Sequence, residues 1–363
     1  MGYARLYFPT DGTVSAANII QDIAGVLTGT ITSVANLRAS TDTRTLSTIV
    51  NTDNSNWTLR FPTAINFNAT ATSTNTSIVL SSSCVNANKT KFIRLAMMVT
   101  TSPGGQTVLP AGTGFFYGQS AGCVLQACTG ATSTTALTNQ TTINSQGVID
   151  HTGPTGCPYF GSNYITLDWS QRHCFMYGFR TTAAAGRRVV MASFEHNEIP
   201  TSQWANTAPV SYLLLDSGST ANAISYTGTY VGGFENIGAS IISYLTELNH
   251  YNTSGQISTG VYNPLSDPIT FALRNDFTLT SNATANFPTS TTKTSTGSVA
   301  TYMQPLFYHQ HNIGVPHMYY SNLSGIYRVA ANIGSEGDLI TIGSDNYVYL
   351  PVNTAYAFAV KRA

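Results

Sequence analysis

Two histidines separated by one residue form the strongest candidate metal site of this chain. His309 and His311 would point to the same face of an extended segment, and His317 follows six residues later. In a trimer, three such pairs would bring six imidazoles to a common axis. The alternative is that these histidines form hydrogen bonds beside Tyr308, Tyr319 and Tyr320 in an aromatic strand pair. Because a His-x-His pair alone is weakly specific, we expect this second arrangement, with neither a resident metal nor a cofactor.

The cysteines offer a second possible metal site. They are Cys84, Cys123, Cys128, Cys157 and Cys174. An odd number in a long chain without an export signal argues against a disulfide framework and predicts free buried thiols. The last four, together with His173, contain donors that zinc accepts. No pair has the two-residue spacing of a zinc knuckle, so we do not expect a zinc site.

Two segments contain residue types that a hydrolase uses. Glu195-His196-Asn197-Glu198 places two carboxylates and an imidazole after an apolar strand. Gly118-Gln119-Ser120-Ala121-Gly122 matches the Gly-x-Ser-x-Gly pattern of a nucleophile elbow, but no long helix follows it. A hydrolytic enzyme would draw on Ser120, Asp168, Glu195 or Glu198. We expect instead a strand-end loop and a turn between strands, and no enzymatic activity.

Neither of the paired glycines, Gly104-Gly105 and Gly232-Gly233, matches a phosphate-binding loop or a dinucleotide fingerprint. Aromatic residues are more informative, because they make up 11% of the chain and tyrosines predominate. Surface tyrosines stack on sugars and form interface hot spots, whereas tyrosines along strands pack in cores. The candidates for an interaction surface are Tyr319, Tyr320, Tyr347 and Tyr349.

Charged residues are scarce: they make up 9% of the 363 residues, against about 25% in ordinary soluble domains. Thr, Ser and Asn take their place, as in the run from 70 to 77. A surface threonine is covered by another protein at small desolvation cost, whereas lysine or glutamate resists it. This composition predicts permanent neighbours. The formal net charge of zero argues against nucleic acid and membrane surfaces as partners, which leaves proteins or sugars.

Length and hydrophobic content predict a large core. We expect the chain to be divided into an N-terminal arm with a helix (1–50), a central β domain (51–300) and a C-terminal β module (301–363). The first residues lack the apolar segment of a secretory signal, so we expect the protein to mature where it is made. No run approaches the roughly 18 apolar residues that a membrane-spanning helix needs.

The hydrophobic pattern predicts a mainly β fold of antiparallel sandwich or barrel domains with about two short helices. Apolar residues recur at three- and four-residue spacing in Ser15–Leu27, with Ser15 as the cap and Gly29 as the stop, and again in Phe234–Asn249. Short aromatic and β-branched runs predict strands almost everywhere else. These are Trp57–Phe61, Ser77–Val85, Phe92–Thr100, Gly114–Gly118, Tyr164–Trp169, Arg172–Phe179, Arg188–Glu195, Ser211–Asp216, Ser225–Val231, Pro268–Leu279, Ala300–Phe307, Gly325–Val329, Leu339–Ile342, Tyr347–Leu350 and Tyr356–Lys361.

Three segments carry further detail. Weak alternation in Phe92–Val99 predicts a strand buried on both faces. The two apolar runs within Leu339–Leu350, which flank Gly-Ser-Asp-Asn, predict a hairpin. The hydroxyl-rich tracts Ala131–Ser145 and Ser281–Ser298 predict long loops, or strands with hydroxyls on an exposed face.

The end of the chain resembles tailed-bacteriophage virion structural proteins. The resemblance rests on Pro316–Val329, on Gly337–Pro351 and on Ala355–Arg362. Proteins of that group often close with a hairpin of the form GD-x-I-T-x-G-x-x-x-Y-x-x-x-P and a final strand of the form YA-x-A-V-K. The segment Arg187–Pro200 is similar in character. The resemblance implies a component of the tail, baseplate, neck or capsid decoration, located in the virion and assembled in the host cytoplasm.

We therefore expect a non-enzymatic virion component that forms a homo-oligomer with copies of itself and with other virion proteins. The first alternative is a host-surface glycan-binding or capsid-decoration protein, which would use tyrosine and tryptophan platforms. The second is a tail-associated polysaccharide depolymerase or esterase. A coat protein of a eukaryotic virus is a further alternative, although the basic arm that holds a genome is absent from the sequence.

Overall fold

A computed structural model describes the chain except for residues 9–10, 38–47, 55, 68–73, 86–89, 102–104, 117–120, 129, 139–163, 183–184, 196–209, 217–228, 238–239, 248–269, 274–290, 296–297, 304–305, 313–315, 323–324, 331–333, 343, 352–355 and 363. Between 210 and 324 only the backbone of the strands is described. The fold is mainly β, and the described strands pair antiparallel, as the sequence predicts.

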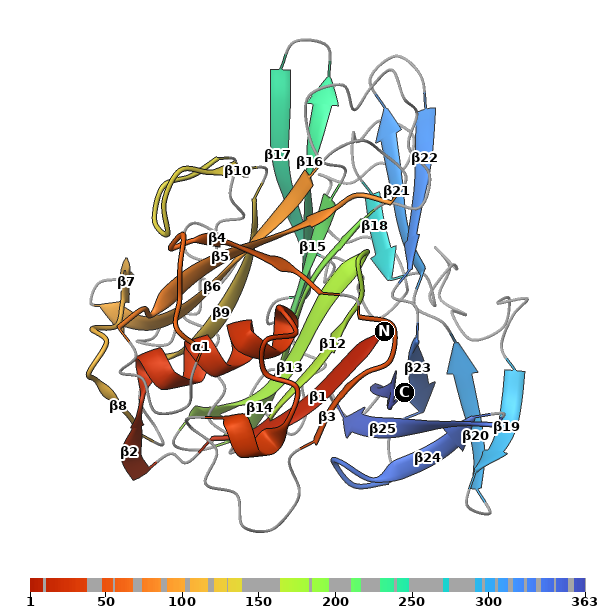
Figure 1. Ribbon diagram of the computed structural model, residues 1–363. Helices are drawn as coiled ribbons and strands as arrows, with labels where there is room; N and C mark the ends of the chain where they lie inside the picture. The colour runs from red at the N-terminus through yellow and green to blue at the C-terminus, as the bar shows by residue number, and fades with distance from the viewer. Residues whose placement is uncertain are drawn as a thin grey trace.

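The large sheet has eight strands in the order β17-β16-β15-β14-β13-β12-β1-β3 (Figure 1). Their bounds are β1 Gly2–Tyr7, β3 Thr48–Asn51, β12 Tyr164–Trp169, β13 His173–Thr182, β14 Ala185–Glu195, β15 Val210–Asp216, β16 Thr229–Ile237 and β17 Ser240–Glu247. From β12 to β17 each strand pairs with the next strand along the chain. The N-terminal strand β1 is an inner strand, between β12 and β3.

A second sheet, here called the five-strand sheet, runs β4-β5-β6-β7, with β9 also paired to β6. Its strands are β4 Thr58–Phe61, β5 Ser77–Ser83, β6 Thr90–Thr101, β7 Gly105–Val108 and β9 Ala121–Cys128. The described side chains of β6 from Lys91 to Met98 are buried except that of Phe92, which is half-buried. The strand predicted to be buried on both faces is thereby confirmed.

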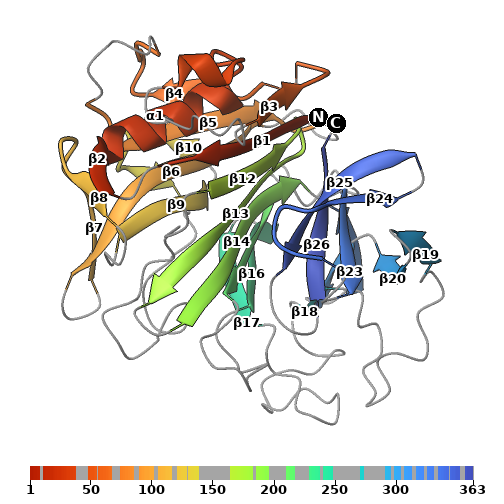
Figure 2. The ribbon, with the colours of Figure 1, turned by 90° about the horizontal axis from the view of Figure 1, so that it is seen from below.

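The C-terminal sheet has the order β19-β20-β23-β26-β25-β24 and lies beside the large sheet (Figure 2). Its strands are β19 Thr291–Ser295, β20 Ser298–Met303, β23 Ile326–Ala330, β24 Leu339–Ile342, β25 Asp345–Pro351 and β26 Tyr356–Lys361. The predicted hairpin is confirmed as β24–β25, with Ile342 opposite Asp345. The small sheets comprise β2 Asp11–Ser15 with β8 Gly114–Phe116, β10 Gly130–Ala131 with β11 Leu137–Thr138, and β18 Thr270–Leu273, β21 Leu306–Asn312 and β22 Pro316–Asn322.

The first predicted helix is confirmed as α1, Ala16–Leu27. The Ser15 side chain caps it by accepting a hydrogen bond from the Asn18 N–H at 3.2 Å, and Gly29 follows it with a φ of +69°. Eleven of its twelve residues are buried. Its apolar side chains share one core with the inner faces of the large sheet and the five-strand sheet.

The second predicted helix, Phe234–Asn249, is wrong. Its described residues belong to β16 and β17, which pair with Ile237 opposite Ser240. Ile241 and Leu245 of β17 are four residues apart, and this spacing places side chains on the same face of a strand as well as of a helix. This part of the stripe therefore fits both periods. The described residues therefore hold one α-helix and a short 3₁₀ helix, Val34–Asn36. The predicted domain boundaries remain predictions.

Candidate functional site

The hairpin that joins β12 to β13 is held at every backbone carbonyl of its turn. The Ser170 carbonyl accepts a hydrogen bond from the indole N–H of Trp57 at 3.1 Å, and the Gln171 carbonyl accepts one from the Ser82 hydroxyl at 3.0 Å. The Arg172 and His173 carbonyls accept from the backbone N–H groups of Glu195 and Ser170, each at 2.9 Å. The turn is therefore fixed to the five-strand sheet and to β14.

Three side chains of this hairpin form a hydrogen-bonded line that we call the hairpin cluster: Asp168, Ser170 and His173. The Ser170 Oγ lies 2.9 Å from His173 Nδ1, and His173 Nε2 lies 2.5 Å from Asp168 Oδ1. Ser170 Oγ also accepts hydrogen bonds from the backbone N–H groups of Arg172 and His173, at 3.0 and 3.3 Å. Since both hydroxyl lone pairs are used, the hydroxyl proton points to Nδ1. This assigns the ring proton to Nε2, which donates to Asp168.

Asp168 is the member of the hairpin cluster whose charged form is most disfavoured by burial. It is 1% exposed, and burial raises the pKa of its carboxyl above the ordinary value, while the His173 hydrogen bond opposes that shift. Its second oxygen, Oδ2, is buried without a hydrogen-bond partner. Nearby Tyr3 remains a neutral phenol, because burial raises its pKa to about 12. Strand β12 thus carries a buried carboxyl group of which one oxygen has no hydrogen-bond partner among the described residues.

The connectivity of serine, histidine and aspartate is that of a nucleophilic triad, but the surroundings differ. A nucleophilic serine needs a free lone pair aimed at a substrate carbonyl. In Ser170 the two lone pairs accept hydrogen bonds from the backbone of its own turn. The geometry therefore fits a hydroxyl that fixes the turn and the imidazole tautomer rather than one that attacks an ester.

A buried ion pair, Lys91–Glu195, lies next to the hairpin. Both side chains are 0% exposed, with Nζ 3.1 Å from Oε2. Lys91 Nζ also donates to the Ser83 carbonyl at 2.6 Å and lies 5.8 Å from the centre of the Trp57 ring. Burial lowers the pKa of Lys91, whereas the nearby Cys84 and Glu195 raise it. These contacts anchor β14 to the five-strand sheet.

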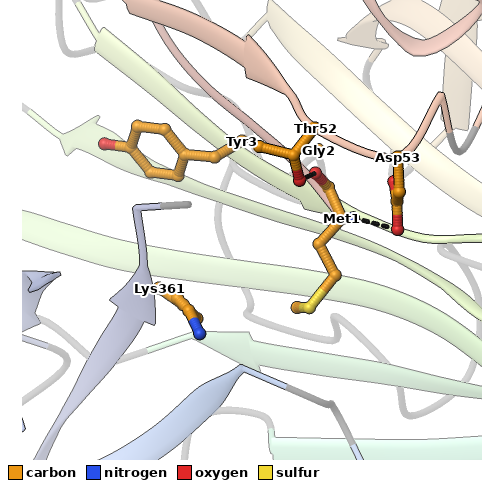
Figure 3. A pocket seen from close by; sticks show the side chains of 6 residues that line it. All are labelled: Met1, Gly2, Tyr3, Thr52, Asp53 and Lys361. Atoms are coloured by element: carbon orange, nitrogen blue, oxygen red, sulfur yellow. Dashed lines mark hydrogen bonds and ion pairs between the residues drawn. The ribbon is translucent and has the colours of Figure 1, made fainter. Parts of the chain in front are cut away.

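A pocket of about 250 Å³ lies where the two ends of the chain meet (Figure 3). It is lined by Met1, by Gly2 and Tyr3 of β1, by Thr52 and Asp53 after β3, and by Lys361 of β26. Its charges are paired, because the Met1 ammonium contacts Asp53 and Lys361 Nζ lies 2.8 Å from Asp345 Oδ2. The charged groups among the described residues that line the pocket are therefore already paired with one another or with Asp345.

The predicted site residues fall into three groups. His309 and His311 lie in β21, opposite Tyr319 and His317 of β22, so the segment has the extended backbone on which the metal interpretation depended. The side chains of these histidines, and those of Tyr319 and Tyr320, lie outside the described residues, as do Ser120, Cys157 and Glu198. Tyr347 and Tyr349 are 3% and 1% exposed in a small core of the C-terminal sheet, so neither reaches the surface of this chain.

The four described cysteines, Cys84, Cys123, Cys128 and Cys174, are buried thiols that form no disulfide among the described residues. Burial raises the pKa of the Cys84 and Cys128 thiols to about 12 and raises that of Cys174 as well, so all three stay protonated and poorly reactive. Among the described residues no group of three or more His, Cys, Asp or Glu side chains is placed to hold a metal ion.

Lys91, Arg94 and Ser170 do not stand out in the sequence, because none of them belongs to a recognisable motif. All three belong to buried polar networks. A signal was nevertheless present, because a cation inside a strand that is buried on both faces requires a buried partner. For the hairpin cluster, the signal was the spacing of Asp168, Ser170 and His173 about a tight turn.

No model of a known protein family matches the chain, and no curated protein is similar to it in sequence. Across the described segments, no helix is both long enough and apolar enough to cross a bilayer.

Proposed function

We propose that this chain is a structural component of a tailed-bacteriophage virion, in the tail, baseplate or neck, that assembles with copies of itself and with other virion proteins. The observation that carries the proposal is the scarcity of charge, 9% of residues, on a chain with 42% hydrophobic residues. Copies of a chain whose surface carries hydroxyl and amide side chains do not repel one another electrostatically. Another protein can also cover such a surface at a low desolvation cost.

The arrangement of the buried charges supports a structural role. Lys91 pairs with Glu195, and Asp168 pairs with His173. The first pair also bonds to the backbone of Ser83 and Val85. These contacts position strands, and they leave the Ser170 hydroxyl committed to its own turn. A rigid antiparallel framework of this kind suits a part that transmits load between neighbours.

Sedimentation velocity on the purified chain, over a range of concentrations, tests the proposal. We expect a discrete homo-oligomer whose interfaces bury well over the roughly 1,600 Å² of a standard complex, and co-purification with particles. A chain that stays monomeric at every concentration and never sediments with particles would refute it. Loss of a measured esterase activity in S170A or D168N, with folding intact, would favour the enzymatic alternative.

A further inference from the structure

Two arginines of the five-strand sheet carry charges that no carboxylate among the described residues neutralises. Arg60 lies on the edge strand β4 and Arg94 on β6, with β5 between them. Ion pairs between described residues involve Lys91, His173, Lys361 and the Met1 ammonium, and none of these pairs includes Arg60 or Arg94. Among the described residues, these two guanidiniums thus have no anionic partner.

Arg94 is held by neutral groups alone. It is 6% exposed; its Nε donates to the Ser77 hydroxyl at 2.7 Å and its Nη1 to the Gln126 side-chain carbonyl at 2.9 Å. Burial lowers the pKa of Arg94, but a guanidinium does not lose its proton in a protein. Arg94 therefore keeps its positive charge. A carboxylate that approached it would form an ion pair, which the neutral Ser77 and Gln126 side chains do not provide.

Arg60 is placed by an irregularity of the edge strand. The register of β4 against β5 shifts between Leu59, opposite Leu80, and Phe61, opposite Val79, so that Arg60 is the extra residue. Bulges at sheet edges re-aim side chains. The Arg60 Nε donates to the Ser81 hydroxyl at 2.6 Å. This bond orients an otherwise exposed guanidinium and leaves its two terminal nitrogens without hydrogen bonds to described residues.

The two anchoring serines, Ser77 and Ser81, are four residues apart on β5, so they lie on one face at a separation of about 13 Å. Both guanidiniums are thus fixed in the same way on the same face. We propose that Arg60 and Arg94 bind carboxylate side chains of a partner polypeptide in the assembled particle. This assignment rests on the proposed function and names the chemistry of one of its contacts.

A polypeptide fits these arginines better than an acidic sugar does. A side-chain carboxylate sits at the end of a slender, flexible stem, whereas a sugar carboxylate is attached directly to a bulky ring. Because Arg94 is 6% exposed, only a slender group can approach its guanidinium. Bidentate pairing with a carboxylate is also the geometry that a guanidinium fork favours.

Fluorescence anisotropy with a labelled peptide of alternating Glu and Ser tests the assignment at low ionic strength. We expect R60Q, and R94K where it folds, to weaken binding about tenfold. K361Q removes a positive charge elsewhere on the chain and serves as the matched control, with a change below about twofold. A peptide of alternating Gln and Ser should not bind. Thermal unfolding of each variant checks that the fold is kept.

The assignment is overturned if the acidic peptide fails to bind the wild-type chain, or if R60Q binds it as tightly as wild type does. Binding of a sialylated or sulfated oligosaccharide that R60Q abolishes, without peptide binding, also overturns it. Sedimentation of the wild-type chain separates the two proposals. A monomer that binds the peptide through Arg60 refutes the proposed function alone, and an oligomer that ignores the peptide refutes the arginine assignment alone.

Discussion

At the scale of single residues, two of the described ion pairs lie entirely inside the fold. Lys91 and Glu195 are completely buried, and each makes a further hydrogen bond to the backbone of the segment Ser83–Val85. Burial of a charge is tolerated only where the partner and the remaining hydrogen bonds are in place. The ion pair therefore acts as a specific link between two sheets.

Removing one partner of that pair should be more damaging than removing both. We expect K91M and E195Q each to lower the free energy of unfolding by about 3–5 kcal/mol, since each leaves an uncompensated buried group. The double variant should lose less stability than either single variant, because it leaves no unpaired charge buried. Urea denaturation of the four proteins measures this coupling. Additive losses would show that Lys91 and Glu195 do not stabilise each other.

Asp168 makes a prediction about pH. Because its folded-state pKa is raised above the ordinary 3.8, the native chain binds more protons than the unfolded chain between those two values. Stability from this group is present at low pH and is lost as pH rises through the folded pKa. D168N, which keeps an oxygen for His173, should remove this slope. Thermal unfolding of wild type and D168N, measured from acid to neutral pH, checks this. D168N should gain stability relative to wild type as pH rises, and this gain should shrink or reverse on acidification. A constant difference would contradict the assignment.

At the scale of elements, the β12–β13 hairpin depends on one hydroxyl. Ser170 Oγ bonds to the imidazole and to two backbone N–H groups, at 2.9, 3.0 and 3.3 Å. We expect S170A to lower stability by about 2 kcal/mol, because the N–H groups of the turn lose their acceptor. Hydrogen exchange at the Arg172 and His173 amides should accelerate in S170A. S193A, which alters a hydroxyl of neighbouring β14 that makes no hydrogen bond, is the matched control and should leave those amides unchanged.

The elements differ in how well the local sequence predicts them. Helix α1 was predictable because its cap, stripe and stop agree with one another. Phe234–Asn249 has the stripe without a matched cap, and its Ile and Tyr residues favour strands, so the pairing partner decides the outcome. The hairpin cluster was predictable only in part. Asp168 and His173 stood out as residue types, but their alignment with Ser170 depends on the register of β12 against β13.

At the scale of the whole molecule, the N-terminal strand and the C-terminal sheet meet at one seam. The Phe175 and Phe358 rings make an edge-to-face contact at 5.8 Å, and the Tyr177 hydroxyl donates to the Pro351 carbonyl at 2.8 Å. On the first strand, the Arg5 side chain packs against Gly337, just before β24, where a Cβ would lie 2.6 Å from Arg5 Nη1. Contacts of this kind, between residues distant in sequence, make the large sheet and the C-terminal sheet depend on each other.

The seam predicts how the chain unfolds. Phe358 is completely buried, so F358A should cost about 3–5 kcal/mol by leaving a cavity against Phe175. Y177F, which removes only the hydroxyl, should cost about 1 kcal/mol. If the sheets form one cooperative unit, urea unfolding of F358A followed by tryptophan fluorescence and by far-UV circular dichroism should give coincident transitions at a lower midpoint. If residues 301–363 are instead an independent module, F358A should split the curve, with circular dichroism reporting an early transition that tryptophan fluorescence does not.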